Sequence, residues 1–291
     1  MYDTVVLKLL KEDIGDKYDW RSVFNKIDQI SEYKPFEGGS GHINGLRVTV
    51  TAKHVKVSGS LSKYFRGTNL DSLTLSQVEK AIKQLGKDLG VPMVKADVER
   101  VDIAENFEMS CPPEFYISKM LTFGASYPNR WEKDTIYFPA SSDGVVLRFY
   151  DKSKEVRRKR KKNNHTGSLS KGVGQNLLRY EICFGQKKIR QMFGHQLKAK
   201  DLYNKEVFWS FISEWLCSYD EPNGRKMDRQ DRQYHKRIQD KIRGAIRHFS
   251  SVMGQPDLIK ELVGKIEAYL TDKFENSPDA YNVREDSASV K

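Results

Sequence analysis

The stretch Val145-Val-Leu-Arg-Phe-Tyr-Asp-Lys-Ser-Lys-Glu155 predicts a strand that leads directly into a strongly basic helix. Successive side chains of a strand point to opposite faces, so one face is expected to be apolar and to fill a core. That face carries Val145, Leu147 and Phe149. The opposite face carries Arg148 and Tyr150, and the tyrosine stands at the end of the strand. Eight Lys and Arg residues follow between positions 152 and 162.

A tyrosine beside so basic a segment is well placed to meet a phosphodiester. We therefore hypothesise that Tyr150 is the nucleophile of a DNA-nicking enzyme. A phenol has a pKa of about 10, so it needs activation at neutral pH, either by the nearby Lys152 or by a metal ion. Tyr64 and Tyr137 are the next candidates for the nucleophile. The same stretch also fits an ordinary sheet tyrosine followed by a solvated charged helix.

The composition indicates a folded protein with an anionic partner. Of the 291 residues, 38% are hydrophobic and 11% are aromatic, which is enough for a sizeable core. The net charge of +11 favours a polyanion, most often nucleic acid.

The cysteines and the apolar runs bear on the compartment. Three cysteines stand far apart without a CxxC pair, which argues against a zinc site and a disulfide framework. They are Cys111, Cys183 and Cys217. No run of about 18 apolar residues predicts a membrane helix. The N-terminus lacks the charged start and cleavage site of a signal peptide. A reducing cytoplasm is therefore expected.

The pattern of segments predicts an α+β fold, with a mostly antiparallel sheet flanked by helices and a helical C-terminal region. Alternation predicts strands at 4–10, 46–51, 54–58, 93–107, 135–138, 145–150 and 176–184. Helical spacing predicts helices at 20–30, 74–89, 114–121, 207–219 and 258–274. The segments 37–41 and 61–69 are expected to be loops. The predicted domains are 1–200 with the candidate site, a helical region at 201–275 and a flexible tail at 276–291.

Four predicted strands have a polar face with chemically active side chains. These faces carry His54 and Lys56, Arg100 and Asp102, Arg148 and Tyr150, and Arg179 and Glu181. If the apolar faces pack on helices, the polar faces are expected to converge on one exposed surface. Carboxylates and an imidazole bind a hard or borderline divalent ion, so Asp102, Glu181 and His54 are the candidate ligands of Mg²⁺ or Mn²⁺. Such an ion would polarise the scissile phosphate.

Each of these side chains also has a simpler explanation. Asp102 could pair with Arg100, and Glu181 with Arg179, as ion pairs of the sheet surface. His54 could be a structural histidine. Glu155 is either a surface charge of the helix or the group that orients Lys152.

Basic side chains are expected to contact DNA phosphates. The candidates are Lys56, Lys63, Arg66, Arg148, Arg157, Arg158 and Arg160. A further segment, 225–247, holds nine Lys and Arg against three Asp. It is either a solvated helix face or a second contact with the DNA backbone, and the net charge favours the latter.

Four blocks occur in order over roughly residues 45–200. They are 54–69, with its lysine and closing Gly-x-Asn; Arg100-Val-Asp-Ile-Ala104; Leu147–Glu155, with a Tyr-x-Lys-x-x-Glu pattern; and Leu178-Arg-Tyr-Glu181. Together they resemble the replication initiators of filamentous bacteriophages, of the gene II and gene X endonuclease type. More distantly, they are similar to rolling-circle plasmid initiators.

The resemblance implies an enzyme that nicks one strand at the phage double-stranded origin and later rejoins the displaced strand. The family's tyrosine falls on Tyr150, which would keep the 5′ phosphate as an ester and leave a 3′-OH. Asp102 and Glu181 fall where the family has acidic residues. The implied fold is related to the HUH endonucleases, although His54-Val-Lys56 lacks the second histidine of a His-x-His pair.

The implied partners are origin DNA, its single-stranded product, and a host polymerase and helicase in the bacterial cytoplasm. A homo-oligomer is possible, and no membrane partner is expected. No Walker motif is present, so the chain itself is not expected to be the helicase.

Other classes remain open. The main alternative is a non-catalytic basic DNA-binding protein that acts as a replication accessory. A relaxase or transposase is disfavoured by the absent His-x-His pair. A tyrosine recombinase is disfavoured because no suitable Arg/His/Arg set surrounds a C-terminal tyrosine.

Overall fold

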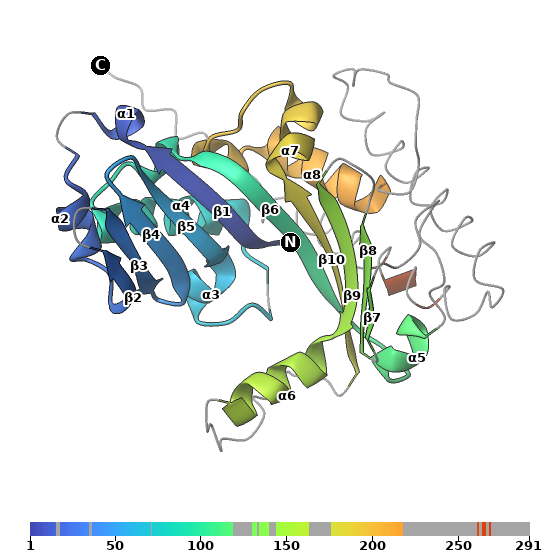
Figure 1. Cartoon of the computed structure of the whole chain (residues 1–291). Coiled ribbons are helices and arrows are strands. Elements are labelled where there is room, and N and C mark those ends of the chain that lie inside the picture. Colours follow the sequence, from blue (N-terminus) through green and yellow to red (C-terminus); the bar gives the residue numbers. More distant parts are fainter. Residues whose placement is uncertain are drawn as a thin grey trace. The chain divides into compact units, whose positions relative to one another are not determined.

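The computed structural model in Figure 1 has an α+β fold, with antiparallel strands flanked by helices, as the sequence predicts. It describes residues 1–15, 18–34, 37–70, 72–118, 130–132, 134–139, 144–162 and 176–217, and four single residues at 261, 264, 265 and 268. The chain divides into two compact units. The first comprises Met1–Asp102, Phe184–Ser210 and Asp272–Lys291, and the second comprises Ile103–Cys183 and Phe211–Thr271.

The strands of the first unit follow the order β2-β3-β4-β5-β1-β6. Their bounds are β1 (Tyr2–Leu10), β2 (Gln29–Lys34), β3 (Gly38–Ile43), β4 (Leu46–Thr51), β5 (His54–Ser60) and β6 (Asp97–Glu108). The central β1 pairs antiparallel with β5, with Leu7 opposite Val57. Both of these side chains are fully buried, so the apolar faces of these strands form the core of this unit.

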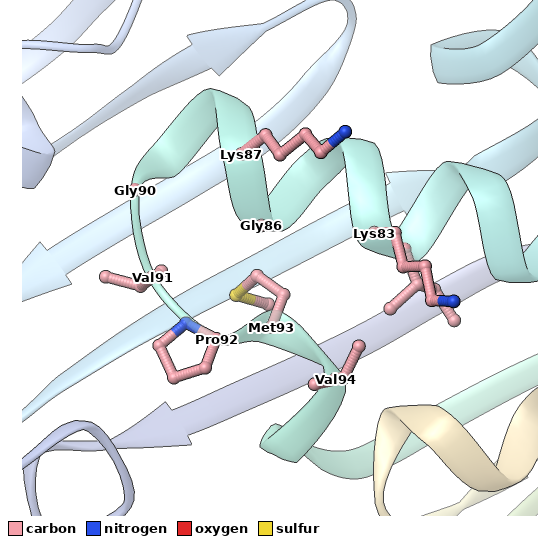
Figure 2. A pocket seen from close by; sticks show the side chains of 9 residues that line it. Lys83, Gly86, Lys87, Gly90, Val91, Pro92, Met93 and Val94 are labelled. Atoms are coloured by element: carbon pink, nitrogen blue, oxygen red, sulfur yellow. The ribbon is translucent and has the colours of Figure 1, made fainter. Parts of the chain in front are cut away.

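The helices of the first unit are α1 (Lys11–Ile14), α2 (Trp20–Phe24), α3 (Leu61–Arg66), α4 (Leu75–Leu89), η1 (Met93–Lys95), α7 (Gln186–Phe193) and η2 (Ala199–Tyr203). All of them apart from α1 bury side chains against this core. The longest, α4, begins at a capping box between Thr74 and Gln77 and ends at Gly90, which has a φ of 67°. Its buried side chains recur at helical spacing, and Figures 1 and 2 show α4 lying over one face of the sheet.

The strands of the second unit follow the order β6-β10-β9-β8-β7. Their bounds are β7 (Arg130–Glu132), β8 (Thr135–Pro139), β9 (Val145–Asp151) and β10 (Leu177–Gly185), and the helices are α5 (Pro113–Ile117), α6 (Lys152–Lys162) and α8 (Lys205–Cys217). The elements β6, β10 and α8 run from one unit into the other. Figure 1 shows α6 continuing from the end of β9 and extending beyond the strands of this unit.

Three stacked aromatic rings lie in the core of the second unit. Phe149 of β9 stacks on Tyr180 of β10, with ring centroids 4.7 Å apart. Tyr180 stacks in turn on Trp215 of α8, also at 4.7 Å, and its hydroxyl donates to the Trp215 carbonyl. Phe149 is buried, which confirms the core-facing position predicted for it, and Tyr180 is buried beside it.

The strands predicted at 46–51 and 54–58 pair antiparallel as β4 and β5. Those predicted at 135–138 and 145–150 pair antiparallel as β8 and β9. The prediction of a loop at 37–41 is wrong, because β3 begins at Gly38. A Cβ at Gly39 would lie 2.4 Å from the Phe24 ring, and one at Gly41 would lie 2.5 Å from the side chain of Ile27. The glycines therefore let apolar side chains press directly against a strand.

Two further expectations of local structure need correction. The helix expected at 20–30 stops at Phe24, and the exposed edge strand β2 follows. The loop expected at 61–69 is largely the helix α3. Ser60 accepts the Lys63 N–H at its start and Gly67 takes a φ of 75° at its end, so both terminal signals were present in the sequence.

Some predictions fall outside the described residues. These are the basic segment 225–247, the tail 276–291, and most of the helix expected at 258–274. The predicted domain boundaries at 200 and 275 stay a prediction.

Candidate active site

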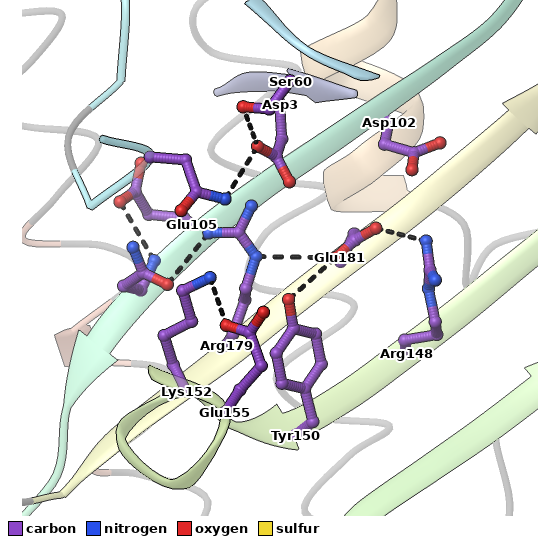
Figure 3. A network of polar contacts seen from close by, with 12 residues as sticks. Asp3, Ser60, Asp102, Glu105, Arg148, Tyr150, Lys152, Glu155, Arg179 and Glu181 are labelled. Carbon is purple, nitrogen blue, oxygen red and sulfur yellow. Dashed lines mark hydrogen bonds and ion pairs between the residues drawn. The ribbon is translucent and has the colours of Figure 1, made fainter. Parts of the chain in front are cut away.

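The candidate site is built around a tyrosine and a carboxylate on neighbouring strands. The hydroxyl of Tyr150, at the end of β9, donates to Oε2 of Glu181 on β10 at 3.3 Å. Arg148, two residues earlier on the same face of β9, forms an ion pair with the other oxygen, Oε1. Figure 3 shows Tyr150 and Arg148 approaching Glu181 from the same strand. The alternation predicted for β9 therefore places both side chains at one carboxylate.

A second arginine approaches the same carboxylate from its own strand. Arg179 is 2% exposed, and its Nε lies 3.5 Å from Glu181 Oε2. Its Nη1 donates to Oδ1 of Asn106 on β6 at 3.0 Å. Asn106 was not predicted as a site residue, because an Asn near the end of a strand carries no distinctive sequence signal. Glu181 thus lies between two guanidinium groups and a phenol.

The predicted cation Lys152 lies close to the tyrosine but is not solvent-exposed. Its side chain is 1% exposed, and Nζ forms an ion pair of 2.6 Å with Oε2 of Glu155. The ammonium lies 6.0 Å from the centre of the Tyr150 ring, at the limit of a cation–π contact. Glu155 was expected to be either a surface charge or the group that orients Lys152, and the contact that the second role requires is present.

The basic helix α6 is fixed to the strands at its first turn. Asp151 accepts the backbone N–H of Lys154 at 2.9 Å, and burial raises the pKa of its carboxyl group. The hydroxyl of Ser153 accepts the N–H of Leu177 on β10 at 3.0 Å. Farther along, Arg158 pairs with Asp134 at 2.5 Å. The direction in which α6 leaves the sheet is therefore set by contacts within the second unit.

Asp102, in the first unit, is held by a neighbouring arginine. Arg100 Nε donates to Oδ1 at 2.7 Å and Nη2 donates to Oδ2 at 2.6 Å. The Asp102 side chain is 1% exposed, whereas that of Arg100 is 37% exposed. The ion pair between Asp102 and Arg100, which was the simpler explanation of Asp102, is therefore present in the structure.

His54 lies among lysines on the polar face of the first unit's sheet. Its Nδ1 is 3.2 Å from the hydroxyl of Thr51. Burial, together with the charges of Lys8 and Lys56, holds the pKa of the imidazole below its usual value. Lys56 Nζ pairs with Glu99 at 2.6 Å. Glu99 was not predicted as a partner of Lys56.

The predicted DNA contacts are spread over both units. Arg66 on α3 donates to the carbonyl of Ser72 and to Gln77. The closing Asn69 of the first sequence block donates to Asp3 at 3.1 Å, which fixes the end of that block to β1. On α6, Arg157 and Arg158 are exposed. The remaining predicted contacts are Lys63 on α3 and Arg160 on α6.

The prediction of one exposed polar surface needs correction in one respect. Glu181, Arg179, Asp102 and Lys152 are buried, although they stand on the polar side of their strands or at a strand end. Charged side chains are buried at this level only when they are paired, and each of the four has a charged partner. Sequence alternation gives the face of a strand but not what covers it.

As they stand, the candidate ligands do not fit a divalent cation. Within the described part of the chain, no group of three or more His, Cys, Asp or Glu side chains is close enough to hold a metal ion. Both oxygens of Asp102 accept from Arg100, and both oxygens of Glu181 are engaged by arginine or phenol. A hard cation would need those same oxygens. Metal binding by Asp102, Glu181 and His54 stays a prediction.

A pocket of about 410 Å³ lies elsewhere, in the first unit (Figure 2). It is lined by the last turns of α4 and by η1, including Gly86, Pro92 and Met93. None of the predicted site residues lines it.

The comparisons place the chain in a family. The family of the phage replication-associated protein (gene II protein), N-terminal region, matches residues 1–206. The chain belongs to this family, which confirms its resemblance to phage replication initiators. No curated protein matches the chain. Among solved structures, a rolling-circle replication initiator protein from Geobacillus stearothermophilus is similar at 14% identity and a TM-score of 0.38. The match covers 83% of this chain and 95% of that chain.

Within the described residues, no helix has the length and apolar character that crossing a bilayer requires.

Proposed function

We propose that this member of the phage replication-associated protein family initiates replication by nicking one DNA strand at a double-stranded origin, with Tyr150 as the nucleophile. The observation that carries the proposal is the hydrogen bond from the Tyr150 hydroxyl to Glu181 Oε2 at 3.3 Å. A phenol needs a proton acceptor to attack at neutral pH, and this carboxylate is within reach. The basic helix that starts at Lys152 follows the tyrosine directly.

In the proposed reaction, the phenolic oxygen of Tyr150 attacks the scissile phosphorus while its proton passes to Glu181. The bond from phosphorus to the 3′ oxygen breaks, and the leaving oxygen takes a proton from water to become a 3′-OH. The 5′ phosphate stays on Tyr150 as an ester. Attack of a 3′-OH on that ester reverses the step, releases the tyrosine and rejoins the displaced strand.

Positive charge around the tyrosine supports the same assignment. Arg148 and Arg179 both contact Glu181, and the Lys152 ammonium lies 6.0 Å from the centre of the Tyr150 ring. These groups would offset the negative charge of a phenolate and of the phosphorane-like transition state. Lys152 is the residue proposed to favour the phenolate, because it is buried and close to the ring.

The contacts with DNA phosphates are assigned to exposed basic side chains, with α6 as the main element. We propose that Mg²⁺ or Mn²⁺ supports the reaction, with the cytoplasm of a bacterial host as its setting. A 3′-OH is the substrate of a polymerase, so a host polymerase and a helicase would follow the nick.

The test is cleavage of supercoiled DNA that carries the element's own origin, in the presence of Mg²⁺ or Mn²⁺. The wild type should convert it to a nicked circle, and Tyr150→Phe should bind the DNA but leave it uncut. Tyr137→Phe is the matched control, because Tyr137 is a tyrosine of the neighbouring strand β8, where it stands opposite Arg148. Salt-sensitive binding without cutting by the wild type would favour the non-catalytic DNA-binding alternative.

A further inference from the structure

The edge strand β2 of the first unit exposes large apolar side chains to solvent. It ends the strand order, with β3 on one side and no described strand on the other (Figure 1). All six of its residues are exposed. Among the described residues, three large apolar side chains are exposed, and two of them, Ile30 at 59% and Tyr33 at 52%, belong to this strand. An unpaired edge of this kind is a surface on which another strand can pair.

A β-bulge places these two side chains on the same face of β2. The register with β3 shifts within the strand, so that Ile30 lies opposite Gly41 and Tyr33 lies opposite Gly39. Opposite residues share a face, and so do residues two apart on β3, which brings Ile30 and Tyr33 to one side. The Tyr33 ring extends the apolar surface of α2, with its centroid 5.3 Å from that of Phe24. One face of β2 is therefore apolar and aromatic.

The other face of β2 carries two opposite charges that suit a second copy of the same strand. Glu32 and Lys34 stand two residues apart, and their side chains pair at 3.5 Å within the strand. In an antiparallel pair related by a two-fold axis, one residue lies opposite itself. With Tyr33 in that position, Glu32 of each copy lies opposite Lys34 of the other, and the two Tyr33 rings meet on the apolar face. A register with Glu32 opposite itself would instead oppose like charges.

The charge around β2 favours a protein partner over DNA. The whole chain has a net charge of +11, but residues 19–37 contain four acidic and three basic side chains. DNA gains little from such a segment, whereas two positively charged copies repel each other least where the local charge is close to zero. A lysine on an edge strand disfavours pairing with unrelated strands. In the self-pairing register, Lys34 meets Glu32, so the same residue favours a second copy.

We propose that β2 is an interface at which a second copy of this chain pairs antiparallel, with Tyr33 opposite Tyr33. The strands of the first unit in both copies would then form one continuous sheet. The regular part of β2 is short, because the bulge precedes Glu32, so the dimer is weak and forms as the protein concentration rises. This inference goes beyond the proposed function and needs neither DNA nor strand cleavage.

The first experiment is disulfide trapping of the full chain with copper phenanthroline, followed by a non-reducing gel. Directly opposed residues have Cα atoms about 4.5–5.5 Å apart, a separation that a disulfide spans. Tyr33→Cys should therefore give a covalent dimer. Ser31→Cys is the matched control, because it is an exposed residue of the same strand. In the proposed register it lies four residues, roughly 13 Å, from its own copy and should not cross-link above the level of the wild type.

The second experiment measures the dimer dissociation constant by sedimentation velocity over a series of protein concentrations. Glu32→Lys replaces two favourable pairs by two repulsive ones and should weaken the dimer about 10-fold. Combining it with Lys34→Glu restores opposite charges in reverse order and should recover the affinity of the wild type. Glu206→Lys is the matched control, because it makes the same charge change at an exposed position outside β2. It should stay within about twofold of the wild type.

The two experiments have clear opposing outcomes, once circular dichroism shows that each variant is folded. Trapping at Tyr33→Cys but not at Ser31→Cys, with recovery in the charge-swapped variant, is the expected result. Equal trapping at both positions, or a charge swap that does not restore association, would overturn the inference. A chain that stays monomeric at every concentration would also overturn it and would leave β2 to a strand of another protein.

Discussion

The Tyr150 hydroxyl and the Glu181 carboxylate meet across the β9–β10 pair, 3.3 Å apart, with Arg148 on the far oxygen of the same carboxylate. This relationship joins two of the four sequence blocks, the Tyr-x-Lys-x-x-Glu block and the Leu178–Glu181 block. In the proposed reaction, each block would supply one partner of the proton transfer from Tyr150 to Glu181.

Replacement of Glu181 by Gln should remove the proton acceptor of the proposed reaction. Loss of a general base typically lowers the rate by about 10²–10⁴-fold, so nicking should fall by that factor. Binding to origin DNA should change by only a few-fold, because the side chain is buried. Single-turnover cleavage and a filter-binding titration on the same preparation measure the two quantities. Nicking at the rate of the wild type would remove Glu181 from the mechanism.

Tyr64→Phe should leave nicking unchanged. Tyr64 is buried on α3, and its hydroxyl donates to Asp88, so burial and that hydrogen bond raise the pKa of the phenol. A phenol held in this way is a poor nucleophile. The variant should instead lose about 0.5–1.5 kcal/mol of unfolding free energy with the hydrogen bond, measured by urea denaturation. A nicking defect without a loss of stability would speak against this assignment.

Asp151→Asn should change how stability depends on pH. Burial raises the pKa of Asp151 in the folded protein, so on titration from acid the unfolded chain ionises first and binds fewer protons. The contribution of this group to stability is therefore largest below the usual carboxyl pKa of 3.8 and is lost as pH rises through the folded pKa.

Asparagine caps a helix about as well as aspartate, so the variant keeps the hydrogen bond to the Lys154 N–H. Its stability relative to the wild type should improve between acidic and neutral pH, as measured by urea denaturation at several pH values. If the difference in stability between the variant and the wild type does not vary with pH, the pKa of Asp151 is not raised on folding.

Arg157→Gln should weaken DNA binding without slowing the chemical step. Arg157 is exposed on α6 and lies outside the contacts around Tyr150 and Glu181. Loss of one phosphate contact should reduce the slope of log affinity against log salt by about 0.7–0.9. Cleavage at saturating protein should match the wild type. An unchanged salt slope would place α6 outside the DNA interface.

Much of the fold followed from alternation and from helix signals. The strands around Val57 and Phe149, and the helix between Thr74 and Gly90, match their predicted positions because their apolar periodicity is regular. The Gly38–Ile43 strand was missed because its glycines imitate a loop, and only the contacts with Phe24 and Ile27 explain them. At such a position, tertiary packing overrides the low strand propensity of glycine.

The candidate site was predicted in part. Tyr150, Glu181 and Lys152 were named from the sequence, and the structure brings Tyr150 and Glu181 into contact. The burial of Glu181 and the role of Asn106 could not be foreseen, since alternation contains no information on what covers a strand. Pairing of Asp102 with Arg100 was foreseen only as an alternative, because the two residues on one strand face fit either an ion pair or a ligand.

The most direct measurement identifies the residue that becomes joined to DNA. Origin DNA is cleaved, the protein–DNA adduct is digested with protease and nuclease, and the modified peptide is sequenced by mass spectrometry. With Tyr150 as the nucleophile, a 5′ nucleotide phosphate is expected on Tyr150 and none on Tyr64 or Tyr137. A phosphate on either of those residues, or cleaved ends that carry a free 5′ phosphate with unmodified protein, would contradict this assignment.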